Sequence, residues 1–224
     1  MDVVQPRPIC ATCQRAYSTC ICQWVRPQST AVEVIILQHP REVSEAKGTG
    51  RLLHLNLSGS VLIVCETLTD SARATITDPQ RQSVLLYPLS CASTKDLGDQ
   101  QGDHHNDLAA NNVLNMCGTT LRLIVLDATW RKSRKMLHLN PLLQTLPRLA
   151  LQDPPPSRYA IRKAHQAHQL STLEATCYAL HQLGEQTDTI NALLQAFDGF
   201  VAQQTSLQQT YQISRVSASD PPLR

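Results

Sequence analysis

The chain has 224 residues, of which 42% are hydrophobic and 17% charged, and its formal net charge is +2. This length suits one packed domain with a small appendage, because domains usually hold about 100 to 200 residues. No apolar run approaches the roughly 18 residues that cross a bilayer, and cysteines interrupt the place of a signal peptide, so we expect a soluble, cytoplasmic protein with no membrane partner and no obligate protein partner.

Four of the eight cysteines crowd into the amino-terminal segment, in the spacing C-x-x-C followed by C-x-C. They are Cys10, Cys13, Cys20 and Cys22. Four thiolates suit tetrahedral zinc and leave no open ligand position, so we predict a structural zinc site in residues 1–28. The alternative is a cluster of free thiols in a reducing compartment. We do not expect these cysteines to be catalytic, because full coordination quenches their nucleophilicity.

Nearly continuous apolar runs, ended by a proline, an aspartate or a polar residue, predict the strands. They are residues 32–37, 61–65, 83–87 and 121–126, with a further strand at 147–151. Strands covered by helices on both faces have such runs, so we predict an α/β fold with a mainly parallel sheet.

Helical signals separate and follow these strands. A short helix is expected after Gly48 and Gly50, and a basic helix over residues 129–139. Ser171-Thr172-Leu173-Glu174 fits a capping box that begins a helix. A last helix is expected over residues 189–203. We predict a long loop between Pro88 and Thr120, with a weak helical segment at 108–116.

The predicted domain boundaries follow from these elements. Residues 1–28 form the cysteine-rich segment, 29–213 the catalytic domain and 214–224 a flexible tail.

The segment Asp127-Ala128-Thr129-Trp130 follows the 121–126 strand and is the strongest candidate for a site, since ligands bind at the carboxyl ends of strands in open α/β sheets. Residues 122–163 hold nine Lys and Arg against two Asp, a local excess of seven positive charges. A carboxylate, a ring and nearby cations together suit RNA chemistry. The alternatives are that Asp127 caps a helix and that Trp130 is a core aromatic.

Several spaced motifs resemble the DTW-domain family, in order from about residue 10 to 200. They are the cysteine cluster, His39-Pro40-x-Glu42 leading to Thr49-Gly50-Arg51-Leu52, Leu86-Tyr87-Pro88, Asp127-x-Thr129-Trp130, Tyr159-x-Ile161-Arg162, and Leu170 through Ala175. The resemblance implies a tRNA-uridine aminocarboxypropyltransferase, related to the SPOUT class, with a carboxyl-terminal trefoil knot around S-adenosylmethionine. The 3-amino-3-carboxypropyl group would pass to N3 of a uridine in the tRNA variable loop, at nucleotide 47, giving acp3U and 5′-methylthioadenosine.

Within that resemblance the site residues take expected roles. The catalytic set is Asp127, as acceptor of the N3 proton, Thr129 as a hydrogen-bonding group and Trp130 as a stacking ring. The expected donor-binding residues are Leu86, Tyr87, Pro88, Arg162, Ser171 and Thr172. The expected RNA-binding residues are Arg51, Arg131, Lys132, Arg134 and Lys135. Arg162 or Arg51 could pair with the donor carboxylate.

Two other functions remain open from the sequence. One is an RNA methyltransferase of the same broad fold, which would transfer the methyl group of the same donor. The other is a zinc-containing RNA-binding module without catalysis. No histidine spacing completes a metal site with a carboxylate, so we expect no catalytic metal.

Overall fold

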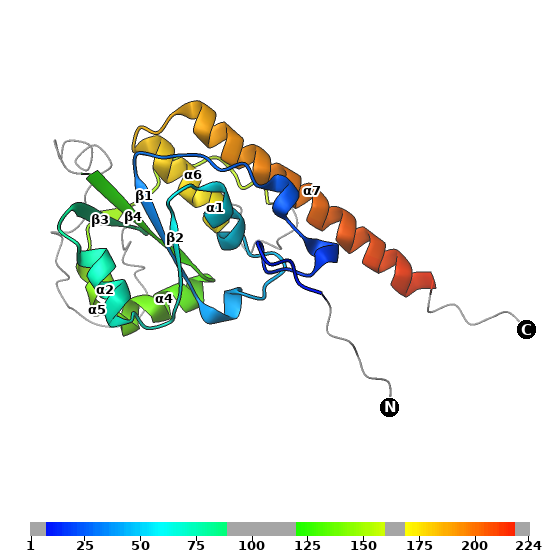
Figure 1. Ribbon diagram of the computed structural model, residues 1–224, viewed down its shortest axis with the longest axis horizontal. Helices are drawn as coiled ribbons and strands as arrows, with labels where there is room; N and C mark the ends of the chain where they lie inside the picture. The colour runs from blue at the N-terminus through cyan, green and yellow to red at the C-terminus, as the bar shows by residue number, and fades with distance from the viewer. Residues whose placement is uncertain (1–7, 89–119, 160–168, 218–224) are drawn as a thin grey trace, which may run out of the picture.

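The centre of the molecule is a five-stranded parallel sheet with the order β2-β1-β4-β3-β5 (Figure 1). The computed structural model describes residues 8–88, 120–159 and 169–217. Its strands are β1 (Glu33–Gln38), β2 (Val61–Val64), β3 (Arg81–Leu86), β4 (Thr120–Asp127) and β5 (Arg148–Leu149). The predicted parallel α/β architecture is therefore confirmed, and each predicted strand lies within about two residues of its observed place.

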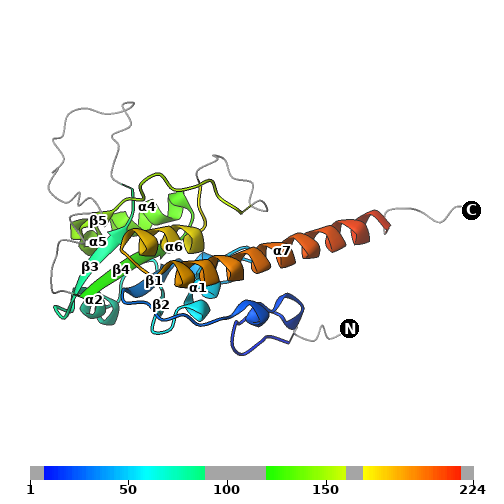
Figure 2. The same cartoon turned by 90° about the horizontal axis from the view of Figure 1, so that it is seen from above.

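Helices cover both faces of this sheet, in three layers (Figures 1 and 2). The helices are α1 (Gly50–Asn56), α2 (Asp70–Thr77), α4 (Trp130–Leu139), α5 (Pro141–Thr145), α6 (Thr172–Gln182) and α7 (Thr187–Ser217), with 3-10 turns η1 (Tyr17–Thr19), η2 (Cys22–Trp24) and η3 (Pro40–Glu42). Along β1, Val34 and Ile36 pack with α1, α6 and α7, while Ile35 and Leu37 pack with α2, α4 and α5. Both faces of the strand are buried, which explains its uninterrupted apolar sequence.

The two ends of the sheet differ in structure because all five strands run in the same direction. Their carboxyl ends meet at one edge, where β4 leads into α4 and where the chain enters α6. The predicted capping box at the start of α6 is confirmed: the Ser171 hydroxyl accepts from the Glu174 amide, and the Glu174 carboxylate accepts from the Ser171 amide. This cap fixes where α6 begins, and so where Thr172 lies.

The last helix is longer than predicted. α7 continues to Ser217, past the expected end at residue 203 and into the segment 214–224 that we predicted as a flexible tail. The reason is local: residues 200–217 contain no proline or glycine, and glutamine, alanine and leucine favour a helix. Its carboxyl-terminal part projects beyond the rest of the molecule (Figures 1 and 2).

The cysteine-rich segment packs against α7 (Figure 2). The Trp24 indole N–H donates to the Gln203 side chain at 2.6 Å, and Gln203 donates to the Cys20 carbonyl at 2.9 Å. Gly199 leaves room for the ring, because a Cβ at that position would collide with Trp24. The segment is thus part of the folded body, although it was predicted as a separate unit.

Two predictions concern segments that lie outside the described residues: the loop between Pro88 and Thr120 with its helical segment, and the motif residues Ile161 and Arg162. Among the described helices, none is long and apolar enough to cross a membrane.

Candidate active site at the carboxyl edge of the sheet

A cavity of about 470 Å³ opens at the carboxyl ends of β3, β4 and β5, next to the amino end of α6. It brings together seven of the residues predicted for the site: Leu86, Tyr87, Pro88, Thr129, Trp130, Ser171 and Thr172. These residues come from three segments separated by dozens of positions in the sequence. The predicted location at the strand ends is therefore where the structure has its large cavity.

The walls of this cavity are mostly apolar. Leucines from β4, β5 and the segments that flank α6 line it, together with Pro154. The polar side chains in the lining are few: Thr129, Ser133, Gln169, Ser171 and Thr172. No charged side chain is among the described residues that line the cavity. Such a cavity suits a flat, weakly polar group such as a nucleobase, with a few hydrogen bonds to orient it.

Two aromatic rings stand at the rim. Tyr87 and Trp130 meet edge to face with their centroids 5.8 Å apart. The Arg148 guanidinium lies 5.6 Å from the Tyr87 centroid. Trp130 is 46% exposed, so it is not an ordinary core aromatic. Its ring is placed where a base could stack on it.

Asp127 is the last residue of β4 and lies behind this cavity, with 5% of its surface exposed. One carboxylate oxygen accepts from the Gln38 amide at 2.7 Å, and the other accepts from the Thr172 hydroxyl at 2.7 Å. Thr129, not Asp127, is the N-cap residue of α4, and its side chain makes no capping hydrogen bond. The interpretation of Asp127 as a simple helix cap is therefore wrong.

Two residues around Asp127 were missed by the sequence analysis as parts of the site. Gln38 ends β1 and is paired with Asp127 in the strand register. Gly50 begins α1 directly against the carboxylate, since a Cβ there would collide with it. The only sequence signal was indirect: both residues lie in or beside the motifs that begin at His39 and Thr49.

The predicted RNA-binding cations do not all behave alike. Arg131, Arg134 and Lys135 are exposed on α4, and the described part of the chain offers no ion pair to Arg131 or Arg134. Lys132 pairs with Glu42 at 2.6 Å and Lys135 with Glu66 at 2.9 Å.

Glu66 links α4 to the end of β1. The Lys135 ammonium and the His39 ring, at 2.9 and 3.1 Å, lower the pKa of the Glu66 carboxyl. Lys135 is thus partly neutralised, whereas Arg131 and Arg134 present unpaired charge beside Trp130.

Arg51 lies apart from this face. It lines a second, small cavity of about 50 Å³ with Arg15, Gln38 and Glu42. It does not line the large cavity, so the structure does not group Arg51 with the α4 cations.

The four amino-terminal cysteines form one cluster, with all four sulfur atoms within 4.8 Å of one another. The Cys10 and Cys22 sulfurs are 3.6 Å apart and the Cys13 and Cys20 sulfurs 3.7 Å. A tetrahedral ion with metal–sulfur bonds of about 2.3 Å needs sulfur atoms about 3.8 Å apart. The donor set and its spacing therefore fit zinc.

The four sulfur atoms also affect one another's ionisation. Backbone N–H groups of Cys13 and Thr12 lower the pKa of the Cys10 thiol to about 6, whereas burial raises the pKa of Cys22 to about 12. A metal ion binds the thiolate form of cysteine.

The fold and the cavity together define an α/β protein with a largely apolar cavity at the carboxyl ends of its parallel strands, the place where such folds bind their ligands. The DTW domain matches residues 7–205. The chain therefore belongs to the DTW-domain family.

Its curated relatives include tRNA-uridine aminocarboxypropyltransferase 2 of Mus musculus, which is 25% identical over 91% of this chain and 66% of its own length. The enzyme of the same name from Drosophila melanogaster is 26% identical over 80% of this chain and 68% of its own length. tRNA-uridine aminocarboxypropyltransferase A of Arabidopsis thaliana is 30% identical over 61% of this chain and 52% of its own length. The chain thus spans about two thirds or less of these proteins. No solved structure matches this chain significantly.

Proposed function

We propose that this protein is a tRNA-uridine aminocarboxypropyltransferase, which transfers the 3-amino-3-carboxypropyl group of S-adenosylmethionine to N3 of a variable-loop uridine, at nucleotide 47. The products are acp3U and 5′-methylthioadenosine. The observation that carries the proposal is the cavity, because Thr129 and Trp130 line it together with the described donor-binding residues at 86–88 and 171–172. The names of the relatives support the same reaction.

The donor fits the large cavity by size and chemistry. Its volume of about 470 Å³ lies in the usual range for pockets of small molecules. The apolar walls suit the adenine of the donor and the thioether of the product 5′-methylthioadenosine, and Leu86, Tyr87 and Pro88 lie at the end of β3 along one wall. Arg162, outside the described residues, is our candidate to pair with the donor carboxylate, since no described lining residue carries charge.

The target base is proposed to enter from the rim and stack on Trp130. Stacking of a base on an aromatic ring contributes about 1 to 3 kcal/mol. Arg131, Arg134 and Lys135 lie on the helix that Trp130 begins, so their charges can hold phosphates on either side of the flipped base.

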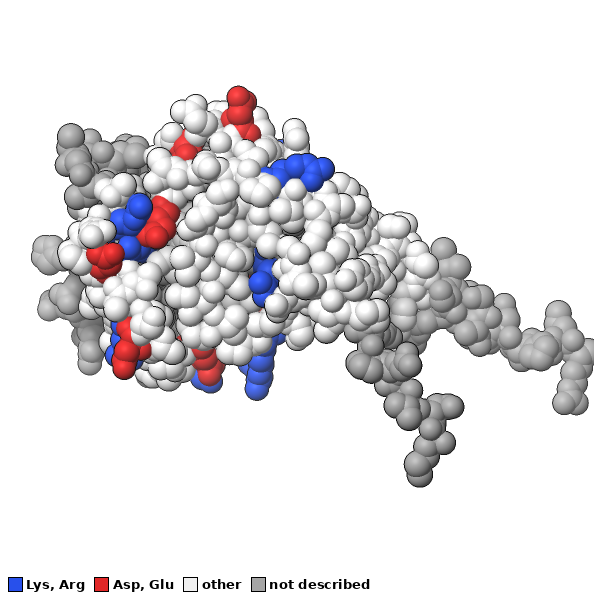
Figure 3. All heavy atoms as spheres, in the orientation of Figure 1, with Lys and Arg blue, Asp and Glu red and all other residues white. Residues whose placement is uncertain are grey.

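On the face shown in Figure 3, basic atoms are scattered, and several lie next to acidic ones. This face carries no continuous basic area among the described residues. Our proposed contact for tRNA is α4 because its exposed cations Arg131, Arg134 and Lys135 lie on the helix that begins at Trp130.

We further propose that zinc occupies the four-cysteine cluster in a structural role. With Cys10, Cys13, Cys20 and Cys22 as ligands, a tetrahedral site is closed to substrate. The ion would hold together a segment that packs against α7 through Trp24. Metal analysis should find about one zinc per chain, and Cys10→Ser with Cys13→Ser should remove it. Zinc content unchanged by the double replacement would rule out this site.

The family resemblance also leads us to propose a SPOUT-like trefoil knot. The Tyr159 hydroxyl, directly before residues 160–168, donates to the Lys47 carbonyl at 2.5 Å, so the described chain after β5 lies next to the segment that precedes α1. An experimental structure that traces residues 160–168 will show whether the chain passes through a loop there.

The reaction is tested by incubating the full chain with unmodified tRNA and with donor labelled either in the methyl or in the carboxyl group. Incorporation from the carboxyl label alone is the expected result. Incorporation from the methyl label alone would identify an RNA methyltransferase. No incorporation, together with retention of tRNA on the protein, would identify a non-catalytic RNA-binding module.

A further inference from the structure

The position of Asp127 raises a chemical problem for the proposed reaction. The uracil N3 must lose a proton, and a carboxylate is the natural acceptor. However, the Asp127 carboxylate is buried, and Asp127 is not among the residues that line the cavity. Thr172, whose hydroxyl donates to the Asp127 carboxylate, does line the cavity and so lies between Asp127 and the space for a ligand.

The direction of the hydrogen bonds around Asp127 follows from the groups involved. An ionised carboxylate only accepts, so the Gln38 amide and the Thr172 hydroxyl must both donate to it. Thr172 has one hydroxyl proton, which is engaged with Asp127. Its oxygen can therefore offer only lone pairs to a ligand in the cavity that Thr172 lines.

No other described hydroxyl in the cavity is arranged in this way. Ser133 donates its proton to the Trp130 carbonyl, and Ser171 accepts from the Glu174 amide within the capping box. The side chains of Thr129 and Tyr87, which also line the cavity, make no hydrogen bond to a carboxylate among the described residues. Among the hydroxyls that line the described cavity, Thr172 is thus the one joined to a carboxylate.

The geometry behind Thr172 holds this arrangement in place. Gln38 and Asp127 face each other across the β1–β4 ladder, and Gly50 presses on the carboxylate from the side of α1. The capping box sets the start of α6, with Thr172 as its first residue. The distance from the Thr172 hydroxyl to the Asp127 carboxylate is 2.7 Å. It is set by the register of β1 and β4, by the start of α6 and by the contact with Gly50.

We propose that Thr172 is a catalytic residue that relays the N3 proton to Asp127; this inference rests on the proposed function. Uracil N3–H donates to the Thr172 oxygen. As N3 forms its bond to the γ-carbon of the donor, its proton passes to Thr172, and the Thr172 proton passes to Asp127. The carbon–sulfur bond breaks, and its electron pair stays on the sulfur of 5′-methylthioadenosine. The Thr172 hydroxyl is regenerated, and Asp127 ends as the neutral acid, with Gln38 still donating to its other oxygen.

The relay gives Asp127 a reason to be buried. Burial keeps the Asp127 carboxylate away from water, so protons from the substrate reach it through the Thr172 hydroxyl. Hydrogen bonds in such chains polarise one another, so an engaged Thr172 oxygen is a better acceptor than a free hydroxyl.

The test compares Thr172→Val and Thr172→Ser in the full chain, with Thr176→Val as a matched control. Thr176 lies one turn further along α6, and its hydroxyl bonds to the Thr172 carbonyl at 2.8 Å and not to Asp127. Single-turnover transfer is measured with saturating tRNA and donor, and binding of 5′-methylthioadenosine is measured by calorimetry.

The expected result is a loss of at least about 100-fold in the transfer rate for Thr172→Val, since acid–base groups usually contribute about 10² to 10⁴. Thr172→Ser should stay within about tenfold of wild type, because it keeps the hydroxyl. Thr176→Val should keep the wild-type rate. The relay places Thr172 against the uracil, and not against the donor to which the sequence assigned it. 5′-Methylthioadenosine should therefore bind Thr176→Val as it binds wild type, and Thr172→Val and Thr172→Ser within about threefold of wild type, which a general disruption of the pocket would not allow.

A second measurement detects the two moving protons. The single-turnover rates of wild type and of Thr172→Ser are measured in mixtures of H₂O and D₂O. Plotted against the fraction of D₂O, each rate should fall along a curve, since two protons move in one step. A straight line in wild type would overturn the relay, as would a Thr172→Val rate within threefold of wild type. Absence of any transfer by the wild-type protein would instead refute the proposed function itself, and the relay with it.

Discussion

The β1–β4 ladder carries a polar pair at each end, and the two pairs differ in kind. At the amino end Glu33 is opposite Arg122, and at the carboxyl end Gln38 is opposite Asp127. The same two strands thus place one buried charge at each edge of the sheet. The contacts of these charges fit a structural role for the amino edge and the chemical role that we propose for the carboxyl edge.

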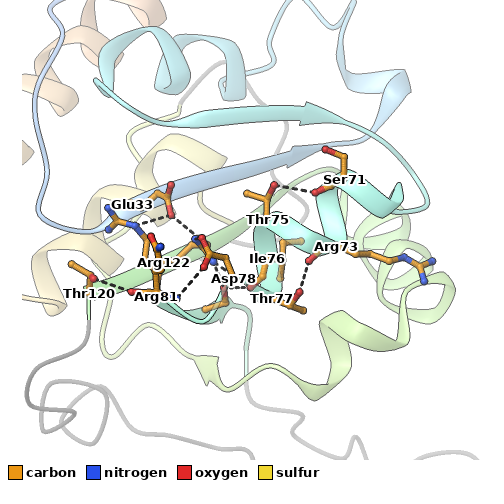
Figure 4. Close-up of polar contacts among 12 residues, drawn as sticks. Glu33, Ser71, Arg73, Thr75, Ile76, Thr77, Asp78, Arg81, Thr120 and Arg122 are labelled. Atoms are coloured by element: carbon orange, nitrogen blue, oxygen red, sulfur yellow. Dashed lines mark hydrogen bonds and ion pairs between the residues drawn. The ribbon is translucent and has the colours of Figure 1, made fainter.

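At the amino edge the buried charge is neutralised by acids (Figure 4). Arg122 is 2% exposed, and its Nε lies 2.6 Å from the Glu33 carboxylate. The Arg122 Nη2 atom lies 3.8 Å from the Asp78 carboxylate, and its Nη1 atom donates to the Ile76 carbonyl at 3.3 Å. Arg81 adds a second cation beside Glu33 at 3.4 Å. This network joins β1 and β4 to β3 and α2. None of its groups lines the cavity at the other end of the sheet.

At the carboxyl edge the neutral Gln38 amide and the neutral Thr172 hydroxyl both donate to the buried charge, among the contacts that it makes. Neither of these two hydrogen bonds is an ion pair that has to break when the carboxylate accepts a proton. Burial is common to Asp127 and Arg122. Our proposal for Asp127 rests instead on its hydrogen bond to Thr172, which lines the cavity.

The largest effect is expected from removing the charge at the carboxyl edge alone. Asp127→Asn keeps the size of the side chain and an oxygen that accepts from Thr172, so the fold should persist. The transfer rate should fall by about 10² to 10⁴ because the proton acceptor is lost. Rates and thermal unfolding are the measurements. Asp78→Asn is the control at the amino edge and should leave the rate unchanged; a near-normal rate in Asp127→Asn would remove the distinction between the edges.

The converse change should affect stability and not chemistry. Arg122→Met removes the cation and leaves Glu33 with Arg81 only, at a cost of about 3 kcal/mol in the free energy of unfolding. Urea unfolding measures this cost. The transfer rate per folded molecule should stay within about twofold of wild type. A loss of rate larger than the loss of folded protein would show that the amino edge takes part in catalysis.

A smaller effect is expected when the carboxylate is displaced and its charge is kept. Gly50→Ala places a methyl group against Asp127, and overpacking of this kind costs about 1 to 3 kcal/mol. We expect the transfer rate to fall by at least about tenfold, because the hydrogen bond to Thr172 is lengthened. A crystal structure of the variant checks the displacement, and an unchanged rate with a shifted carboxylate would argue against the relay.

The smallest effect concerns the cations outside the cavity. Arg134→Gln should weaken tRNA binding and lower the slope of log affinity against log salt by about 0.7 to 1, as expected for one phosphate contact. Lys132→Gln is the matched change on the same helix, and it should alter the slope less, because Lys132 already pairs with Glu42. Titrations at several salt concentrations measure both slopes. Equal slopes for the two variants would mean that α4 does not present Arg134 to RNA.

Much of the fold was predictable because its signals are local. The strands stand out as apolar runs, the start of α6 as a capping box, and the cysteine cluster as a spacing of thiols within thirteen residues. α2 was missed because only Ala72 and Ile76 of its eight residues are buried, so its apolar pattern is weak. The length of α7 was underestimated because its last turns have little apolar periodicity.

For the site, the local pattern was enough to predict that Asp127 ends a buried strand and that Trp130 follows soon after it. The contacts of Asp127 depend on how distant segments pack. Gln38 is 89 residues away in the chain and Thr172 is 45 residues away. Strand register places Gln38 beside Asp127, and the capped start of α6 places Thr172 there. No local sequence pattern predicts either contact. Trp130 could equally have been buried; it is exposed because α4 turns its first residue toward the cavity rim.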